Sequence, residues 1–204
     1  AADYKTSIMV DYIYLFNPAY TQLKKICKQQ RAIKFIKSFG GNHGPFRAYS
    51  SLWDYGPHDI ALILDLLQQT PRAVKARILN FAGDKFNTEC ELEFAGVNSI
   101  SLFGNNFSQK MRRLEVYFAE FVLIFDDVDK HKLCRYAVHW EEENNPRILA
   151  ESKEELACPQ EFPLDLALKE FSRGPGLSAC WDLTFTEKVT AVLESANLEL
   201  AKWK

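Results

Sequence analysis

The chain has 204 residues, of which 47% are hydrophobic and 25% charged, and its formal net charge is −2. This composition excludes a disordered or fibrous protein, and the near balance of charge supplies no general attraction to a nucleic-acid backbone. The length fits one domain, or one domain plus a piece of another. No apolar run approaches the roughly 18 residues that a membrane helix needs, so we expect neither a nucleic acid nor a membrane as partner.

The first elements in chain order are predicted to be a strand and a helix. Residues 8–16 are almost all β-branched, aromatic or otherwise apolar, which is typical of a strand covered on both faces in a parallel sheet. Asn17 and Pro18 then fit the N-cap and first position of a short basic helix. Without neighbouring strands, residues 8–16 would present an apolar edge. We therefore expect them to pair with another chain or to be poorly ordered.

The next stretch is predicted to contain a strand, a loop and a helix. Residues 32–39 have the composition of a strand, and the breakers from Gly40 to Pro45 indicate a loop. Apolar residues at helical spacing then predict a helix over 57–68. Pro57 is expected at its first position, where the missing N–H costs nothing.

A block of strands follows. Apolar and charged residues alternate at 74–78 and 89–94, which predicts strands with one buried and one solvated face. Further strands are expected over 99–103, 112–125 and 133–140, and helices over 164–171 and from Phe185 to Trp203. Consecutive strands with helices before and after them, instead of between them, indicate an α+β fold with a mainly antiparallel sheet.

The cysteines and histidines favour neither a disulfide framework nor a metal site. The five cysteines are widely spaced and include no C-x-x-C pair, and the four histidines add no compact set of ligands. This usage favours a reducing, cytoplasmic location. No metal is expected.

Residues 51–60, SLWDYGPHDI, are the one segment whose side chains indicate a catalytic site. If Pro57 begins the helix, His58 lies in the first turn, where the helix dipole disfavours imidazolium and helps to keep the ring neutral. Asp54 could orient that ring or favour its cation. Spacing alone leaves structural roles open, with His58 as a cap and Asp59 as a first-turn acid that complements the dipole.

In its context, Asp54-x-x-x-His58 resembles the second-domain motif of the glucose–fructose oxidoreductase, inositol dehydrogenase and MocA (Gfo/Idh/MocA) family. Upstream, residues 9–12 and 16–20 resemble the family's last dinucleotide-domain strand and the turn after it. Downstream, residues 162–171 and the final helix resemble its C-terminal signature. The resemblance covers most of the chain.

The resemblance implies an oxidoreductase that transfers a hydride between NAD or NADP and a sugar or sugar-nucleotide carbinol or carbonyl carbon. It implies that His58 is the catalytic acid/base and that Asp54 binds substrate or orients His58. It also implies a second domain with a large open sheet and helices on one face. One face of such a sheet contributes to the substrate pocket, and the other commonly forms an oligomer interface, so we expect a homo-oligomer.

The chain also departs from the family. It contains no G-x-G-x-x-G after a strand and no Glu-Lys-Pro, and Leu15 stands near the place where many members carry an arginine. We therefore expect residues 1–30 to be the remnant of a dinucleotide-binding domain and residues 31–204 to be the C-terminal substrate and oligomerisation domain. We expect this fragment to bind no cofactor and to be inactive alone.

Two other functions are compatible with these residues. The chain could be a non-catalytic dimerisation module in which Asp54 and His58 merely cap a helix. It could also be a sugar-binding module that uses the sheet without chemistry. An upstream glycine-rich Rossmann half with Glu-Lys-Pro would favour the enzyme, and sugar binding without redox activity would favour the binding module.

Overall fold

The computed structural model describes residues 7–30, 32–44, 49–82, 85–142, 145–176 and 178–203. The helices in these ranges are α1 (Pro18–Gln29), α2 (Ser51–Leu67), α3 (Pro163–Arg173) and α4 (Leu183–Ala201), with short 3-10 turns η2 (Ile13–Phe16), η3 (Ala150–Ser152) and η4 (Ala179–Trp181). The strands are β1 (Phe35–His43), β2 (Ala73–Ala82), β3 (Lys85–Glu93), β4 (Asn98–Gly104), β5 (Asn106–Tyr117), β6 (Phe121–Asp126), β7 (Leu133–Glu142), β8 (Asn145–Ile148) and β9 (Glu154–Glu155). None of these helices is both long and apolar enough to cross a membrane.

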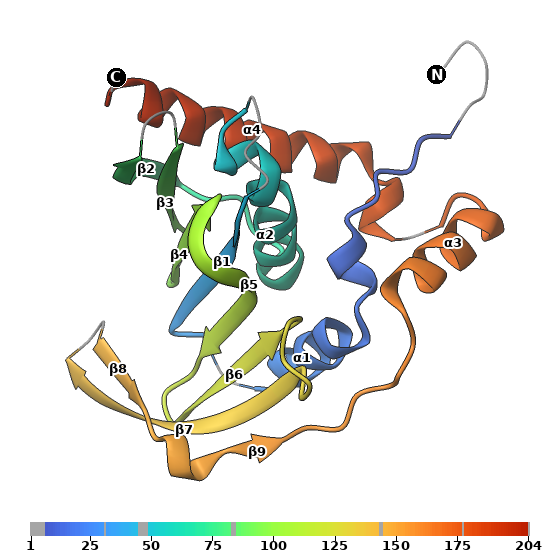
Figure 1. The fold of residues 1–204 in the computed structure, drawn as a ribbon. Coiled ribbons are helices and arrows are strands. Elements are labelled where there is room, and N and C mark those ends of the chain that lie inside the picture. The colour runs from blue at the N-terminus through green and yellow to red at the C-terminus, as the bar shows by residue number, and fades with distance from the viewer. Residues whose placement is uncertain are drawn as a thin grey trace.

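The strands form one large curled sheet with the order β2-β3-β4-β1-β5-β6-β7-β8, and β9 pairs with β7. Only the β1–β4 pair is parallel among the strand pairs of the described ranges. Helix α2 packs on β1, β3 and β4, and α4 packs on β2 and α2, so these helices cover one face of the sheet (Figure 1). The expected α+β class, with a large and mainly antiparallel sheet, is confirmed.

Alternation along the strands divides the apolar side chains between the two faces of the sheet. Leu92 of β3 and Leu114 of β5 belong to the main core under the helices. Tyr117, three positions after Leu114, belongs to a second, smaller cluster with Val122 and Ile124. Because alternate side chains of a strand point to opposite faces, the same strands supply apolar residues to the helix-covered face and to the opposite face.

The expected strand over residues 8–16 is wrong. Residues 7–12 have no regular structure and Ile13–Phe16 form η2, because a strand needs a neighbour to receive its backbone hydrogen bonds. The segment nevertheless packs within its own chain, contrary to expectation: the Val10 N–H donates to the Cys180 carbonyl at 2.8 Å, and buried Tyr12 packs edge-on against Phe185. The following helix start is confirmed, since the Asn17 side chain accepts from the Ala19 N–H.

The predicted loop after residue 39 is also wrong over its first part. Strand β1 continues through Gly40 and Gly41 to His43, although paired glycines usually interrupt strands. A Cβ at Gly41 would overlap the Phe107 ring, and one at Gly40 would lie 2.7 Å from Arg112 Nη1. The glycines thus admit close neighbours within the sheet. Pro45, the end of the predicted loop, lies outside the described residues.

Two further boundaries differ from the sequence-based expectations. The long strand expected over 112–125 is divided into β5 and β6, which are joined at residues 118–120. The final helix buries Phe185 and Leu193 as expected, but Trp203 lies beyond its end and is exposed. The helix therefore covers the core with its central turns.

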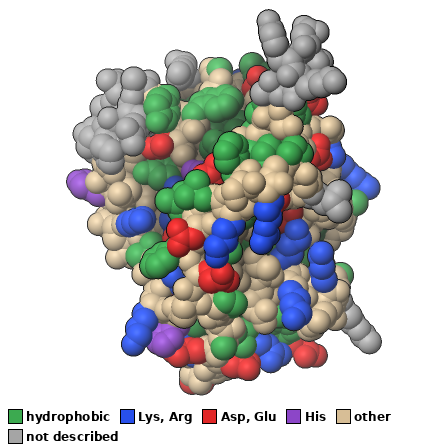
Figure 2. Space-filling model, turned by 90° about the vertical axis from the view of Figure 1, so that its right-hand side faces the viewer, with side chains coloured by type: hydrophobic (Ala, Val, Ile, Leu, Met, Phe, Trp, Pro, Cys, Tyr) green, Lys and Arg blue, Asp and Glu red, His purple; other side chains and the backbone are tan. Residues whose placement is uncertain are grey.

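Helix α3 has an exposed apolar stripe. It packs on η2, and Leu164, Leu168 and Phe171 are each more than half exposed. Figure 2 shows hydrophobic side chains gathered in the upper half of the face that is on the right in Figure 1, whereas charged side chains gather in the lower half. Exposed apolar side chains gathered in this way are uncommon on a protein surface.

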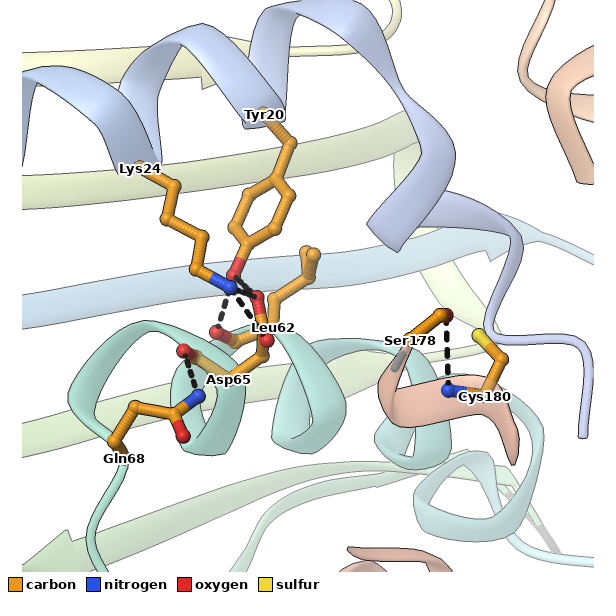
Figure 3. Close-up of polar contacts among 7 residues, drawn as sticks. All are labelled: Tyr20, Lys24, Leu62, Asp65, Gln68, Ser178 and Cys180. Atoms are coloured by element: carbon orange, nitrogen blue, oxygen red, sulfur yellow. Dashed lines mark hydrogen bonds and ion pairs between the residues drawn. The ribbon is translucent and has the colours of Figure 1, made fainter. Parts of the chain in front are cut away.

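Helix α1 is held against α2 by a buried polar network (Figure 3). Lys24 Nζ lies 2.7 Å from both carboxylate oxygens of Asp65, and the Tyr20 hydroxyl donates to Asp65 Oδ2 at 2.6 Å. The Gln68 side chain donates to the Asp65 carbonyl at 2.7 Å. Because η2 directly precedes α1, this anchor also fixes η2 beside α2, where the candidate site lies.

Candidate functional site

Helix α2, which carries Asp54 and His58, begins six residues earlier than expected. It starts at Ser51, with Ser50 as N-cap, and Pro57 lies inside it. The amide N–H groups of Trp53 and Asp54 donate to the Ser50 carbonyl, so the first turn forms before the proline. Pro57 only removes the hydrogen bond that its own N–H would have made to the Trp53 carbonyl. The signal that could have located this start is the Ser50-Ser51 pair, since serine is a favoured N-cap.

The early start changes the roles expected from the helix dipole. Asp54 lies in the first turn, where a carboxylate is stabilised by the positive end of the dipole. His58 lies two turns into the helix, so the proposed influence of the dipole on its imidazole is wrong. Residues four apart lie on the same helix face, and the Asp54 carboxylate acts electrostatically on His58. The structure therefore brings the two predicted residues together.

The His58 imidazole is largely enclosed by aromatic and polar neighbours. Its ring centre lies 5.2 Å from that of Tyr14 in η2, with the rings nearly perpendicular. Its Nδ1 atom is buried and has no hydrogen-bond partner among the described residues. His58 caps neither end of α2, because it lies two turns inside the helix, and its unpaired buried nitrogen costs free energy.

A buried cation, Arg112 of β5, lies beneath this site. Its guanidinium carbon is 4.6 Å from the ring centre of Tyr55 and 5.2 Å from that of Tyr14. Its Nη1 is 3.7 Å from Oδ1 of Asp59, and both side chains are at most 10% exposed. Sequence reasoning missed Arg112. A signal existed, because alternation along β5 places it on the same face as buried Leu114 and Val116.

Burial and these charges shift two pKa values in opposite directions. Burial and then the Arg112 charge lower the pKa of His58 from 6.5 to about 4, while the Asp54 carboxylate acts to raise it. Burial raises the pKa of Asp59 from 3.8 to about 6, against the opposing effects of Arg112 and the Ser38 hydroxyl. His58 is therefore an uncharged imidazole at neutral pH and can accept a proton or a hydrogen bond.

The cavities described for this chain lie elsewhere. One of about 630 Å³ lies among the start of α1, the turn between β6 and β7, and the segment 155–163. Two others measure about 490 and 370 Å³. Neither Asp54 nor His58 lines any of the three. Among the residues that the structure describes, no group of three or more histidine, cysteine or acidic side chains could hold a metal ion.

Three glycines among the described residues lie in helices or strands and not in a phosphate-binding turn. Gly40 and Gly41 lie within β1, against Arg112 and Phe107, and Gly56 lies within α2 against Leu193. A pyrophosphate needs a glycine-rich turn between a strand and a helix N-terminus. None of these three glycines provides that arrangement.

Solved structures similar to this chain are oxidoreductases. One, a protein from Magnetospirillum magnetotacticum MS-1 assigned as an oxidoreductase, is 27% identical with a TM-score of 0.83, and the match covers 96% of this chain and 64% of that one. The UDP-N-acetylglucosamine 3-dehydrogenase of Acidithiobacillus ferrooxidans is 15% identical with a TM-score of 0.72, covering 98% and 63%. An NAD-binding oxidoreductase of Klebsiella pneumoniae is 13% identical with a TM-score of 0.73, covering 100% and 67%.

These matches identify the fold of the chain as that of an oxidoreductase domain. The chain spans slightly under two thirds of the first two proteins. Comparison with protein-family models and with curated proteins found no match.

Proposed function

We propose that this chain is the substrate-binding portion of an NAD(P)-dependent oxidoreductase that acts on a sugar or sugar nucleotide, with His58 as the acid/base. The observation that carries this proposal is an uncharged, half-buried imidazole with an unpaired Nδ1, on the same helix face as Asp54. The likeness to a 27% identical protein assigned as an oxidoreductase supports the reaction class. The likeness in fold to a UDP-N-acetylglucosamine dehydrogenase supports the substrate class.

The roles of the two side chains follow from their charges. Oxidation of a carbinol releases a hydroxyl proton as the hydride leaves, and the neutral imidazole of His58 is able to accept that proton. The Asp54 carboxylate favours the resulting imidazolium and can also accept a hydrogen bond from a sugar hydroxyl. Reduction of a carbonyl uses the same pair in the opposite direction.

The dinucleotide would be held by a different part of a longer protein. NAD or NADP would be the hydride acceptor or donor, and Gly40, Gly41 and Gly56 do not form a turn that could bind its pyrophosphate. We propose that residues 1–30 end that dinucleotide-binding domain and that residues 31–204 form the substrate and oligomerisation domain. The exposed apolar stripe of α3 supports a contact with that domain. The substrate pocket would then form between α2 and the preceding domain.

We also propose that the sheet face opposite the helices forms a homo-oligomer interface. Lys37 Nζ lies over the rings of Phe35 and Tyr117 on this face, at 5.6 and 5.5 Å from their centres. In Figure 1, α2 and α4 lie on the other side of the sheet. Sedimentation equilibrium would test the interface, and a purely monomeric chain at high concentration would contradict it.

The five cysteines are free, which supports a reducing, cytoplasmic location.

The test of the proposed function is turnover by the complete enzyme with NAD or NADP and a panel of aldoses and UDP-sugars. His58→Ala should lower kcat by roughly 10²–10⁴-fold, the usual contribution of a general acid/base. His139→Gln, which changes an exposed histidine on β7, is the matched control and should leave kcat unchanged. An unaltered kcat in His58→Ala would remove His58 from the mechanism.

The same test separates the enzyme from a binding module. Sugar binding by the complete protein without any reduction of the dinucleotide would favour the module. Calorimetry of this chain alone with NADH and NADPH should detect no binding. Micromolar binding to these 204 residues would contradict the proposed division of the protein.

A further inference from the structure

The cation beneath the candidate site is held from several directions. Arg112 reaches from β5 into the layer between the sheet and α2, where its guanidinium lies against the rings of Tyr14 and Tyr55. Rings of this kind attract a guanidinium through their negative faces. Asp59, at 3.7 Å, supplies the opposite charge. The four residues come from three elements, so the guanidinium has little freedom to move.

The backbone of β1 leaves space for this arrangement. A Cβ at Gly40 would lie 2.7 Å from Arg112 Nη1, 2.9 Å from Asp59 Oδ2 and 3.1 Å from the Cβ of Tyr55. Any other residue at this position would therefore displace the guanidinium or the carboxylate. Gly40 in the middle of a strand is explained by the ion pair that packs on it.

The pair is not an optimised structural salt bridge. Arg112 Nη1 and Asp59 Oδ2 are both buried and have no hydrogen-bond partner among the described residues. Buried ions that lack full hydrogen bonding cost more than their attraction returns. A second ion pair, between Lys24 of α1 and Asp65 of α2, has contacts of 2.7 Å. The incomplete hydrogen bonding of Arg112 therefore points to a role other than stability.

We propose that Arg112 is a positioning residue for His58: clamped between Tyr14 and Tyr55 and paired with Asp59, it holds the Tyr14 ring against the imidazole and opposes a second positive charge there. The inference rests on the proposed function, in which His58 must be unprotonated before it accepts a proton. It assigns to Arg112 a role that acts through His58 and not through the substrate.

The charged and titratable groups around His58 support this role. Asp54 and Asp59 face the site from α2, Tyr14 from η2 and Arg112 from β5. Asp127, after β6, acts electrostatically on Tyr14. Among the causes that shift the pKa of His58, burial and Arg112 lower it and Asp54 raises it. Arg112 is thus the charged group that opposes protonation.

The experiment is an NMR titration of the histidine imidazoles in this chain, which needs neither cofactor nor substrate. In the wild-type chain, His58 should titrate near pH 4. Arg112→Met removes the charge at similar length and should move the His58 midpoint upward by about one pH unit. Arg112→Lys keeps the charge and should stay close to the wild type.

A second variant covers the case in which Arg112→Met fails to fold because Asp59 is left unpaired. Asp59→Asn combined with Arg112→Met has no charge on either partner and should fold, with the same upward shift at His58. An unchanged His58 midpoint in whichever of these two variants folds would overturn the proposal, as would an Arg112→Lys midpoint equal to that of Arg112→Met. Since no turnover is measured, this failure is distinguishable from a failure of His58 as the acid/base.

Discussion

Helix α2 carries two buried aspartates, six residues apart, in opposite circumstances. Asp65 receives Lys24 on both oxygens and the Tyr20 hydroxyl, so its carboxylate is fully engaged. Asp59 has Arg112 at 3.7 Å and an oxygen without a hydrogen bond. Burial without adequate partners raises the pKa of Asp59 to about 6.

The contrast separates a structural end of the helix from a functional one. Buried polar groups with complete hydrogen bonding rigidify a fold, whereas buried groups with perturbed pKa values are found preferentially at functional sites. His58 follows the same pattern as its neighbour Asp59, because its Nδ1 is buried and has no hydrogen-bond partner among the described residues. We therefore expect substitutions at the two ends to act on different properties of the protein.

The largest effect on stability is expected at Asp65. Asp65→Asn removes the charge that pairs with Lys24 and weakens the acceptor of the Tyr20 hydroxyl, and it should lower the free energy of unfolding by about 2–4 kcal/mol. Urea denaturation at pH 7 measures this change. A loss below about 0.5 kcal/mol would contradict the structural role of Asp65, because Asp65 would then contribute no more than an exposed ion pair.

The pH dependence of stability should differ between variants at the functional end. The pKa of His58 is lowered on folding, so its contribution to stability is lost as pH falls from 6.5 to about 4. The pKa of Asp59 is raised on folding, so its contribution is present at low pH and is lost as pH rises from 3.8 to about 6. Between pH 4 and 6 the two slopes oppose each other.

Removing one of the two groups should expose the slope of the other. His58→Gln should become more stable as pH falls from 6 to 4, by about 2 kcal/mol relative to the wild type. Asp59→Asn should become less stable over the same range. Denaturation at several pH values measures both slopes, and equal slopes in the two variants would contradict the assigned pKa shifts.

A smaller effect of opposite sign is expected at Asp59 near neutral pH. Because folding raises its pKa to about 6, the ionised carboxylate destabilises the fold at pH 7, and Asp59→Asn should raise the free energy of unfolding by about 1–3 kcal/mol. Thermal denaturation of Asp59→Asn and Asp65→Asn under the same conditions compares the two changes in stability directly. A large loss of stability in Asp59→Asn would show that the Arg112 pair is structural after all.

The sequence was informative wherever the local pattern and the tertiary context agree. Alternation at residues 74–78 and 89–94 predicted β2 and β3, because the same period decides both local conformation and burial. The apolar stripe of the final helix was equally clear. Asp54 was expected just before the helix that carries His58, close enough to act on its ring, whereas the structure places both residues within α2, four positions apart.

The failures have a common physical cause, which is a partner that lies far away in the sequence. Residues 8–16 have the composition of a strand but no strand to pair with among the described residues. Gly40 was interpreted as a breaker, because its close approach to Arg112 and Asp59 is not visible locally. Arg112 itself acts on His58 across more than fifty positions. Only its place on an apolar strand face could have indicated that it is buried.

The most direct test of the account measures two quantities on the same variants of the complete enzyme: kcat per folded molecule and the free energy of unfolding at pH 7. We predict that His58→Gln keeps its stability and loses at least about 100-fold in kcat, whereas Asp65→Asn loses stability and keeps kcat. A His58→Gln enzyme with wild-type kcat would contradict the account.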